Sequence, residues 1–304
     1  MSILRIAKEH GGFSMRKKTI DWDAYILIGP VFILFTFTVL YPAFSTFKLS
    51  FYELNGLSKQ IPIGFENYKM LFQDRNFLRS LWVTLIWTFA STGLSVGLGW
   101  IIALLSGLIP RKSTPYRTAI FLAYGISPVV SGLMWIGIFR QTGGLLNGIL
   151  EAVGLEALTR AWLGDRNVAL AAVLTAFIWI QTGLPLLNIF ASIRAIPNSI
   201  LEAATIDGAS PWMLMRKIFV PLSIPGVKVS VFINMLGSLK AFDIILILTD
   251  GGPIRSTETL GFFMYKESFL FFKQGYGAAA TVVLTLFVLF IAIPLIKERT
   301  EGAS

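Results

Sequence analysis

Long stretches without a charged residue alternate with short polar stretches along the whole chain. Each of five such stretches is long enough to cross a membrane, because a helix needs about 20 residues to span the hydrocarbon layer. They cover residues 24–47, 80–110, 118–139, 167–193 and 274–296. A sixth stretch, 229–248, is apolar except for Lys240 and Asp243, which we expect to face each other on one helix. The pattern predicts an all-α, polytopic membrane protein with six transmembrane helices.

The first apolar stretch has a second interpretation, a cleaved signal peptide. Arg16, Lys17 and Lys18 precede it, and Ala43-Phe44-Ser45 near its end imitates a small-x-small cleavage site. The apolar run is nevertheless longer than the 7 to 15 residues of a signal peptide core. We therefore expect a helix that is retained in the membrane.

Composition supports the membrane class and defines the expected domains. Hydrophobic residues make up 55% of the 304 residues and charged residues 14%, more apolar surface than one soluble core of this size could bury. We expect a basic cytoplasmic tail at 1–23 that contacts membrane lipid, a transmembrane domain at 24–296, and a cytoplasmic tail at 297–304.

Several kinds of chemistry lack the residues they need. The chain has no cysteine and a single histidine, His10 in the polar tail, so thiolate metal sites, disulfides and histidine-dependent catalytic triads are excluded. It also lacks the G-x-x-x-x-G-K-[ST] loop that binds ATP phosphates. We expect no metal, no cofactor bound by this chain and no enzymatic activity. The net charge of +9 follows from membrane topology rather than from nucleic-acid binding.

Basic residues set the expected orientation, because cytoplasmic loops of membrane proteins are enriched in lysine and arginine. With the N-terminus inside, the cytoplasmic segments hold 14 basic and 7 acidic residues, against 11 and 9 outside. Six helices return the C-terminus to the cytoplasm. A polar insert at 194–228, between the fourth and fifth helices, then also lies in the cytoplasm.

The first half of this insert has the pattern of a short helix followed by a tight turn. Asn198 or Ser199 can cap the helix start after Pro197, and good helix formers follow over 200–206. Gly208 then permits the positive φ that a sharp helix exit needs.

The second half of the insert predicts another short helix. Ser210 is a suitable N-cap and Pro211 a suitable first residue. The helix is expected over 212–219, ended by Pro221 and Pro225 before the next span. Two helices joined by a glycine turn form either a surface on which another protein docks or an ordinary amphipathic connector lying on the membrane.

Four uncharged polar residues lie within the expected spans. Gln181 and Asn188 are seven residues apart, on one helix face, and Asn234 and Ser238 are one turn apart. Such residues either hydrogen-bond neighbouring helices or line a polar substrate path. Gln181, Asn188, Asn234 and Ser238 are therefore candidates for the path.

Two further features of the spans are ambiguous. Lys240 and Asp243 form either a structural ion pair or part of a translocation route. The G-x-x-x-G pattern of Gly93 and Gly97, extended by Gly99, predicts that another helix approaches closely.

The insert resembles the EAA loop of bacterial ABC-importer permease subunits. The shared residues are Glu202-Ala203-Ala204, then Asp207-Gly208-Ala209, then Ile218-x-x-Pro221 and Pro225, with Val220 where leucine is usual. A second segment, Asp250-Gly251-Gly252-Pro253 followed by Ser256-Thr257-Glu258-Thr259-Leu260, is similar to a loop of sugar permeases of the maltose-permease type, where glycine is commoner than Asp250. Gly29-Pro30 and Tyr41-Pro42 are similar to the same group, so the resemblance covers essentially the whole chain.

This resemblance implies a subunit of a multi-protein sugar importer in the inner membrane of a bacterial or archaeal cell. Its partners would be a cytoplasmic ABC ATPase dimer that uses ATP-Mg, a second permease subunit in a heterodimer, and an extracytoplasmic solute-binding protein. The residues that would couple the chain to the ATPase are Glu202, Ala203, Ala204, Asp207 and Gly208.

Other functions fit parts of the same pattern. The solute could be glycerol phosphate or a polyamine instead of a sugar. A secondary transporter driven by an ion gradient would use Lys240 and Asp243 as its coupling site. A membrane scaffold would use the insert to recruit a soluble protein without transporting anything.

Overall fold

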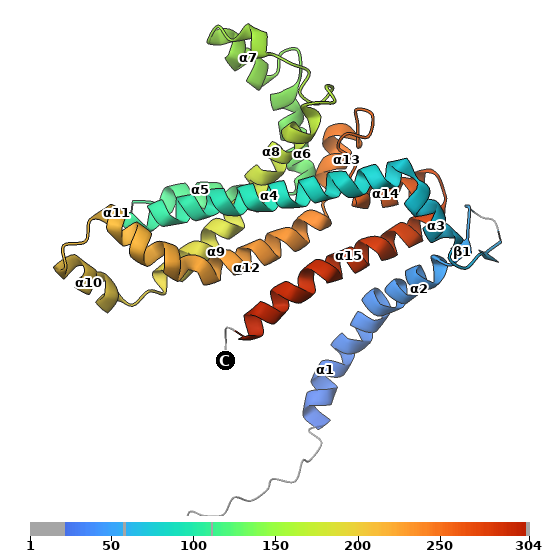
Figure 1. Ribbon diagram of the computed structural model, residues 1–304, viewed down its shortest axis with the longest axis horizontal. Helices are drawn as coiled ribbons and strands as arrows, with labels where there is room; N and C mark the ends of the chain where they lie inside the picture. Colours follow the sequence, from blue (N-terminus) through green and yellow to red (C-terminus); the bar gives the residue numbers. More distant parts are fainter. Residues whose placement is uncertain (1–21, 57–58, 111, 302–304) are drawn as a thin grey trace, which may run out of the picture. The chain divides into compact units, whose positions relative to one another are not determined.

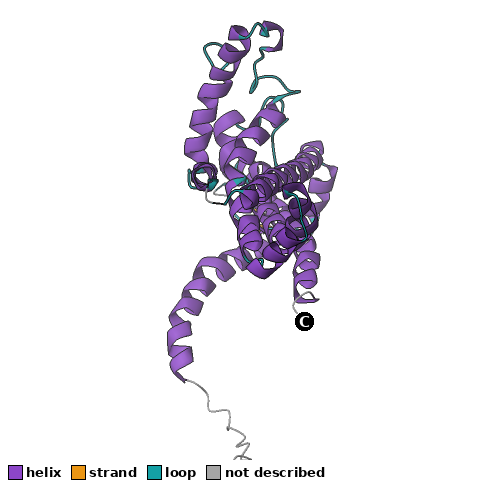
Figure 2. Cartoon of the chain, turned by 90° about the vertical axis from the view of Figure 1, so that its left-hand side faces the viewer, coloured by secondary structure: helices purple, strands orange, loops and turns teal. Residues whose placement is uncertain are grey.

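The computed structural model describes residues 22–56, 59–110 and 112–301. The expected N-terminal tail, with His10 and the basic residues before the first span, lies outside the described residues apart from its last two positions. The chain divides into two compact units, residues 1–46 and 47–304. Helices, drawn in purple in Figure 2, make up most of the described residues of each unit.

The first unit is helical throughout its described part. It comprises α1 (Trp22–Phe35), the π-helical turn η2 (Thr36–Leu40) and most of α2 (Tyr41–Leu49). Residues 27–49 are long and apolar enough to cross a membrane, in agreement with the first expected span.

The second unit contains the remaining elements (Figure 1). It begins with a two-stranded antiparallel ribbon of β1 (Tyr52–Glu53) and β2 (Ile61–Pro62), in which Tyr52 pairs with Pro62 and Glu53 with Ile61. The helices up to the insert are α3 (Glu66–Gln73), α4 (Arg75–Leu108), α5 (Thr114–Tyr124), α6 (Pro128–Phe139), α7 (Leu145–Ala152), η3 (Glu156–Leu158), α8 (Ala169–Gln181) and α9 (Gly183–Arg194). The later helices are α10 (Asn198–Ile206), α11 (Pro211–Leu214), η4 (Met215–Phe219), α12 (Val220–Leu239), α13 (Asp243–Thr249), α14 (Leu260–Tyr265), η5 (Lys266–Leu270) and α15 (Gln274–Glu301).

Three helices of this unit, α4, α9 and α12, pack pairwise against one another. Gly99 of α4 permits one close approach, because a Cβ at this position would lie 2.8 Å from the backbone nitrogen of Leu186 in α9. The expected approach at Gly93 and Gly97 is wrong within the described part of this chain, where no atom lies within 4 Å of a Cβ built on either residue. The close contact thus occurs at the third glycine of the pattern only.

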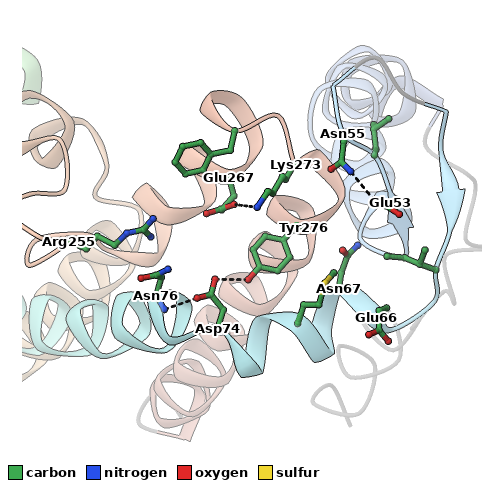
Figure 3. A pocket seen from close by; sticks show the side chains of 14 residues that line it. Glu53, Asn55, Glu66, Asn67, Asp74, Asn76, Arg255, Glu267, Lys273 and Tyr276 are labelled. Carbon is green, nitrogen blue, oxygen red and sulfur yellow. Dashed lines mark hydrogen bonds and ion pairs between the residues drawn. The ribbon is translucent and has the colours of Figure 1, made fainter.

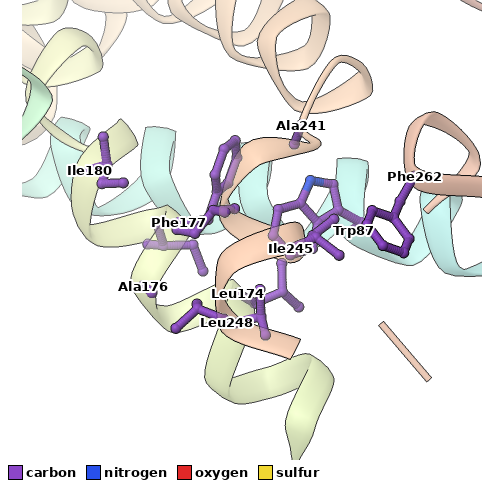
Figure 4. Packing of buried hydrophobic residues seen from close by; sticks show 12 residues of the cluster. Trp87, Leu174, Ala176, Phe177, Ile180, Ala241, Ile245, Leu248 and Phe262 are labelled. Carbon is purple, nitrogen blue, oxygen red and sulfur yellow. The ribbon is translucent and has the colours of Figure 1, made fainter. Parts of the chain in front are cut away.

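A second buried cluster joins α4, α8, α13 and α14 (Figure 4). Trp87 of α4 is fully buried, and its ring centroid lies 4.9 Å from that of Phe177 in α8. Ile245 of α13 and Phe262 of α14 are also fully buried in this cluster. Apolar burial therefore fixes the short helices on either side of the 250–259 loop.

The third expected span, 118–139, is not one straight helix. The axes of α5 and α6 meet at 103°. Ser127 adopts an extended conformation (φ −55°, ψ 137°), as expected for the residue before a proline. Gly132 of α6 packs against Ile247 of α13, where an added Cβ would lie 2.8 Å from the Ile247 side chain, so a distant element holds the new direction of the chain.

The fifth expected span, 229–248, is also broken. α12 ends at Leu239, and α13 begins at Asp243. The expectation that Lys240 and Asp243 face each other on one helix is wrong, and no ion pair joins them among the described residues. The break removes the helical spacing on which that expectation depended.

The number of spans stays a prediction. Within the described residues, 27–49, 75–108 and 211–239 are long and apolar enough to span alone. Two bent pairs, α5 with α6 and α8 with α9, raise the count to at most five, and 274–290 is a shorter apolar helix. The structure thus supports a polytopic helical protein without fixing the count at six.

Candidate functional site

The insert projects at one end of the second unit, where Figure 1 shows α10 and α11. No residue of α10 or α11 is buried. The expected caps at the start of α10 are wrong: Pro197 is the last extended residue (φ −57°, ψ 136°), so Asn198 and Ser199 already lie inside the helix.

The turn between the two helices has the expected geometry. Gly208 has φ +74°, a conformation that costs other L-residues energy. The backbone N–H of Ala209 donates to the carbonyl of Ala204 at 2.9 Å, closing the helix end. Ser210 caps α11, since its Oγ accepts from the Met213 backbone N–H at 3.3 Å. The helix-turn-helix geometry of the insert is therefore confirmed.

The five candidate coupling residues lie together on this projection. Glu202, Ala203, Asp207 and Gly208 are exposed, and Ala204 is half-buried. A shallow groove of about 460 Å³ runs along α10 and is lined by Asn198, Leu201, Glu202, Thr205 and Ile206. Ile206 is 86% exposed and Trp212 66%, so apolar side chains as well as a carboxylate are available to a partner.

The second helix of the insert continues past Pro221 and Pro225. α11, η4 and α12 form one apolar helical segment over 211–239, so the expected end at Pro221 and Pro225 is wrong. The backbone N–H of Val220 donates to the carbonyl of Met215, a π-type bond immediately before Pro221. This wider turn accommodates the proline, which has no N–H and would collide with the preceding turn of a regular helix.

The same arrangement occurs in the first unit. The backbone N–H of Tyr41 donates to the carbonyl of Thr36, again immediately before a proline, Pro42. Two of the π-type turns therefore mark prolines that the helix passes instead of ending.

Two of the four candidate path residues are buried and hydrogen-bonded. Asn234 of α12 accepts from Ser95 Oγ of α4 at 3.2 Å and donates to the carbonyl of Ser230 at 3.0 Å. Ser238 donates to the carbonyl of Met235 in its own helix at 2.8 Å. Asn234 thus joins α12 to α4.

The other two candidates lie on either side of a bend. Gln181 ends α8 and Asn188 lies in α9, and the two helices meet at 40°. The expectation of one continuous helix face is therefore wrong. Both residues are half-buried, and the buried Nδ2 of Asn188 has no hydrogen-bond partner in the described part of the chain.

The sequence interpretation missed a buried polar face on α4. Its members recur at helical spacing, which was the available signal: they are Ser80, Thr84, Thr88, Ser91 and Ser95. Thr84 Oγ1 accepts from the Leu260 backbone N–H at 2.7 Å. The face meets both the loop before α14 and, through Ser95, α12.

A polar pocket, shown from close by in Figure 3, lies at the start of α4, and the insert lies at the other end of this helix (Figure 1). Asp74 caps the start of α4 beside this pocket, whereas Gly107 near its end contacts Phe219 of η4. The pocket has a volume of about 860 Å³ and is lined by residues of β1, α3, the start of α4, η5 and the start of α15. Each carboxylate oxygen of Asp74 accepts one hydrogen bond, Oδ1 from the Asn76 backbone N–H at 2.8 Å and Oδ2 from the Tyr276 hydroxyl at 2.9 Å.

Glu267 is the buried carboxylate of this pocket. The residue is 6% exposed, and its Oε2 has no hydrogen-bond partner among the described residues. Lys273 Nζ lies 3.9 Å from Oε2. Burial raises the pKa of the Glu267 carboxyl above its ordinary value, against the opposing effect of the Lys273 and Arg255 charges.

A second buried carboxylate, Glu258, lies beside the pocket. It accepts from Arg255 at 2.9 Å, from Lys266 at 3.4 Å and from Ser80 Oγ at 3.2 Å, and its side chain is fully buried. These contacts fasten the 250–259 loop to α4 and η5.

Asp250 in the same loop has φ +49°. This left-handed conformation favours glycine and tolerates aspartate. Backbone geometry therefore accounts for an aspartate where the resembling permeases more often carry glycine.

Comparisons with known proteins agree with one another. A family model, the binding-protein-dependent transport system inner membrane component, matches residues 95–298. The sulfoquinovosyl glycerol transport system permease protein SmoG of Agrobacterium fabrum is 31% identical over 264 residues, 86% of this chain and 85% of that protein. The sn-glycerol-3-phosphate transport system permease protein UgpA of Pectobacterium atrosepticum is 31% identical over 279 residues, 90% of this chain and 92% of that protein.

Solved structures show the same fold. A chain of a bacterial ABC transporter involved in the import of the acidic polysaccharide alginate aligns with a TM-score of 0.78 at 22% identity, covering 92% of this chain and 96% of its own. The alginate transporter was also solved in complex with an alginate pentasaccharide-bound periplasmic protein, and this structure gives a TM-score of 0.74.

Proposed function

The chain belongs to the family of binding-protein-dependent transport system inner membrane components, and on this premise we propose that it carries a sugar or oligosaccharide into the cytoplasm. As a permease subunit of an ABC importer, it is a transport protein and not an enzyme. Alternating access would be driven by ATP hydrolysis in a separate ATPase.

The observation that carries this proposal is the exposed insert and its continuity with α12. Glu202, Asp207 and Gly208 lie on the surface, and the second helix of the insert continues without a stop to Leu239. A short rigid element that an ATPase grips at one end can therefore change the tilt of a membrane helix at the other. This supports coupling through the insert and is difficult to reconcile with a loose amphipathic connector.

The proposed partners follow from the same premise. They are an ATPase dimer that uses ATP-Mg, a second permease subunit forming a heterodimer with this chain, and an extracytoplasmic solute-binding protein. The periplasmic protein bound to the alginate transporter is a precedent for the last of these. The insert would face the cytoplasm, with both termini on the same side.

Glycerol phosphate is the second candidate solute. The UgpA relatives, which are named for sn-glycerol-3-phosphate transport, match this chain at 31–32% identity over about nine-tenths of its length. A sugar is preferred because the Asp250-Gly251-Gly252-Pro253 loop resembles a loop of sugar permeases of the maltose-permease type.

Reconstitution tests the proposal. The chain would be placed in vesicles with a second permease, an ATPase and a binding protein encoded by neighbouring genes, and uptake of labelled sugars and of sn-glycerol 3-phosphate would be measured. We expect sugar uptake only when all partners and internal ATP-Mg are present. Uptake by this chain alone under an ion gradient would instead support a secondary transporter, and complex formation without any uptake would support a scaffold.

A further inference from the structure

We propose that the pocket around Glu267 binds one ring of a neutral sugar at the extracytoplasmic mouth of the permease. This inference rests on the proposed function, which places the insert in the cytoplasm. Because the pocket and the insert lie at opposite ends of α4 (Figure 1), the pocket then faces the side from which the solute arrives.

Glu267 Oε2 is an oxygen that accepts no hydrogen bond in the described part of the chain, because Lys273 Nζ, at 3.9 Å, is near enough for an ion pair only. This oxygen is buried, and the Glu267 side chain is 7% exposed. Leaving a buried charged acceptor unsatisfied costs free energy. A ligand that donates a hydrogen bond at this atom would recover part of that cost.

The charged side chains of the pocket disfavour a charged ligand. The lining carries four carboxylates, from Glu53, Glu66, Asp74 and Glu267, and these repel an anion. A cation is also disfavoured at Oε2, because Lys273 lies 3.9 Å away and Arg255 acts on the same carboxylate. A neutral hydroxyl meets neither form of repulsion.

The lining of the pocket combines hydrogen-bond donors, hydrogen-bond acceptors and apolar side chains. The amide of Asn76 and the cations of Arg255 and Lys273 are donors, and the carboxylates are acceptors. Met70 and Phe271 provide apolar surface between these groups. A sugar ring needs both kinds of contact, because its hydroxyls exchange hydrogen bonds while its C–H faces pack on apolar groups. The volume of about 860 Å³ is within the usual range for small-molecule sites and accommodates one or two rings.

Saturation-transfer NMR on the full chain with its second permease subunit in nanodiscs tests this site in the absence of the binding protein and ATPase. The probes are glucose and maltose as neutral sugars, sn-glycerol 3-phosphate as an anion and spermidine as a cation. We expect saturable binding of a neutral sugar and at least tenfold weaker binding of both charged probes.

Two variants connect binding to the pocket. Glu267→Gln replaces the free acceptor by an amide of the same size, and Met70→Trp fills the pocket from an exposed position on α3. Each is expected to weaken sugar binding at least tenfold. Glu156→Gln, an exposed carboxylate in η3 that does not line the pocket, removes the same charge and should leave binding unchanged.

The inference is overturned if no neutral sugar binds, if a charged probe binds more tightly, or if both pocket variants bind like the wild type. These outcomes are distinct from failure of the proposed function. Vesicles that import a sugar while the pocket binds none would retain the function and reject the site. A pocket that binds sugar in an importer that carries none would retain the site and reject sugar import.

Discussion

At the residue scale, Gly208 shows how one backbone conformation shapes the insert. Its φ is +74°, and nothing lies within 4 Å of a Cβ built on it. A side chain here would therefore meet open space. Any loss of stability caused by a substitution would come from the strained backbone conformation alone. The sequence of the insert could predict this residue because the conformational freedom of glycine is a local property.

Gly208→Val is expected to strain the turn by about 1–2 kcal/mol, because a β-branched residue is disfavoured at positive φ. Uptake by the reconstituted importer should fall severalfold, while the amount of chain in the membrane fraction stays unchanged. Gly208→Asn is the matched control, since asparagine tolerates the left-handed conformation and should retain most of the uptake. Normal uptake by the valine variant would contradict a coupling role for this turn.

Glu267 makes the stability of the second unit dependent on pH. Burial raises the pKa of its carboxyl above the ordinary value of 4.5, so the folded chain holds this proton to a higher pH than the unfolded chain does. The stabilisation from the protonated form is complete below pH 4.5 and is lost as the pH rises through the folded-state pKa.

Glu267→Gln should remove the loss of stability that the wild type shows as the pH rises. Thermal unfolding in detergent is expected to show similar Tm values for variant and wild type near pH 4.5, and a progressively higher Tm for the variant as the pH is raised towards 7. Glu66→Gln, at an exposed carboxylate of the same pocket, controls for the loss of one negative charge. A Tm difference that does not change with pH would refute the assignment.

At the element scale, α9 is held between α4 and α12 by close backbone approaches. A Cβ at Gly226 of α12 would collide with Ser192 Oγ and lie 3.0 Å from the carbonyl oxygen of Asn188 in α9. Gly97 of α4, by contrast, has open space around it. Two glycines in apolar helices thus have different structural roles, which their sequence context does not distinguish.

Gly226→Leu is expected to force α9 and α12 apart and to lower stability by about 1–3 kcal/mol, the usual cost of overpacking. Gly97→Leu introduces the same side chain where the Cβ meets no described atom within 4 Å, and should change stability by much less. Tm values of the two purified variants, measured in the same detergent, make the comparison. Equal losses would show that helix propensity and not packing sets the cost.

The breaks between helices mark the limit of prediction from sequence. Apolar runs located the helical segments because lipid requires backbone groups to be satisfied within a helix. Ser127 and Pro128 mark the position of the break between α5 and α6. Its angle of 103° could not be predicted, because it goes with a contact between Gly132 and Ile247, residues far apart in the chain. Nor could the apolar runs show that the helix passes Pro221 through a π-type turn.

In the candidate site, too, local features could be predicted from the sequence and contacts between distant segments could not. The insert is local, so its turn and exposed residues followed from short motifs. The pocket around Glu267 combines β1, α3, η5 and α15, and no spacing in the sequence brings these segments together. The polar face of α4 could be predicted in part: the helical spacing of its residues is visible in the sequence, but the segments that it contacts are not.

At the scale of the whole second unit, a buried ion network connects distant parts of the chain. Glu258 receives hydrogen bonds from Arg255 and Lys266, and from Ser80, which lies 178 residues earlier. The loop before α14 is thereby fixed to α4, beside the wall of the pocket.

Glu258→Gln should lower the stability of the unit by roughly 1–3 kcal/mol, because two cations lose their buried counter-ion while keeping partial access to water. Glu66→Gln, which breaks the exposed 3.6 Å pair with Lys69, should cost less than about 1 kcal/mol. Tm shifts of the purified chain measure both effects. Similar shifts for the two variants would mean that burial of Glu258 contributes little.

The uninterrupted segment 211–239 has a mechanical consequence. Its 29 residues make a rod of about 43 Å, so a tilt of about 10° about its midpoint moves each end by roughly 4 Å. A displacement of the Trp212 end would therefore produce an opposite displacement of at most this size near Leu239, which is buried. Two places where a helix bends readily, the π-type turn at Met215–Phe219 and Pro225 inside α12, lie in the half of this segment between Trp212 and its midpoint. Bending there would absorb part of the movement, and residues 226–239 form the part without a proline or a π-type turn.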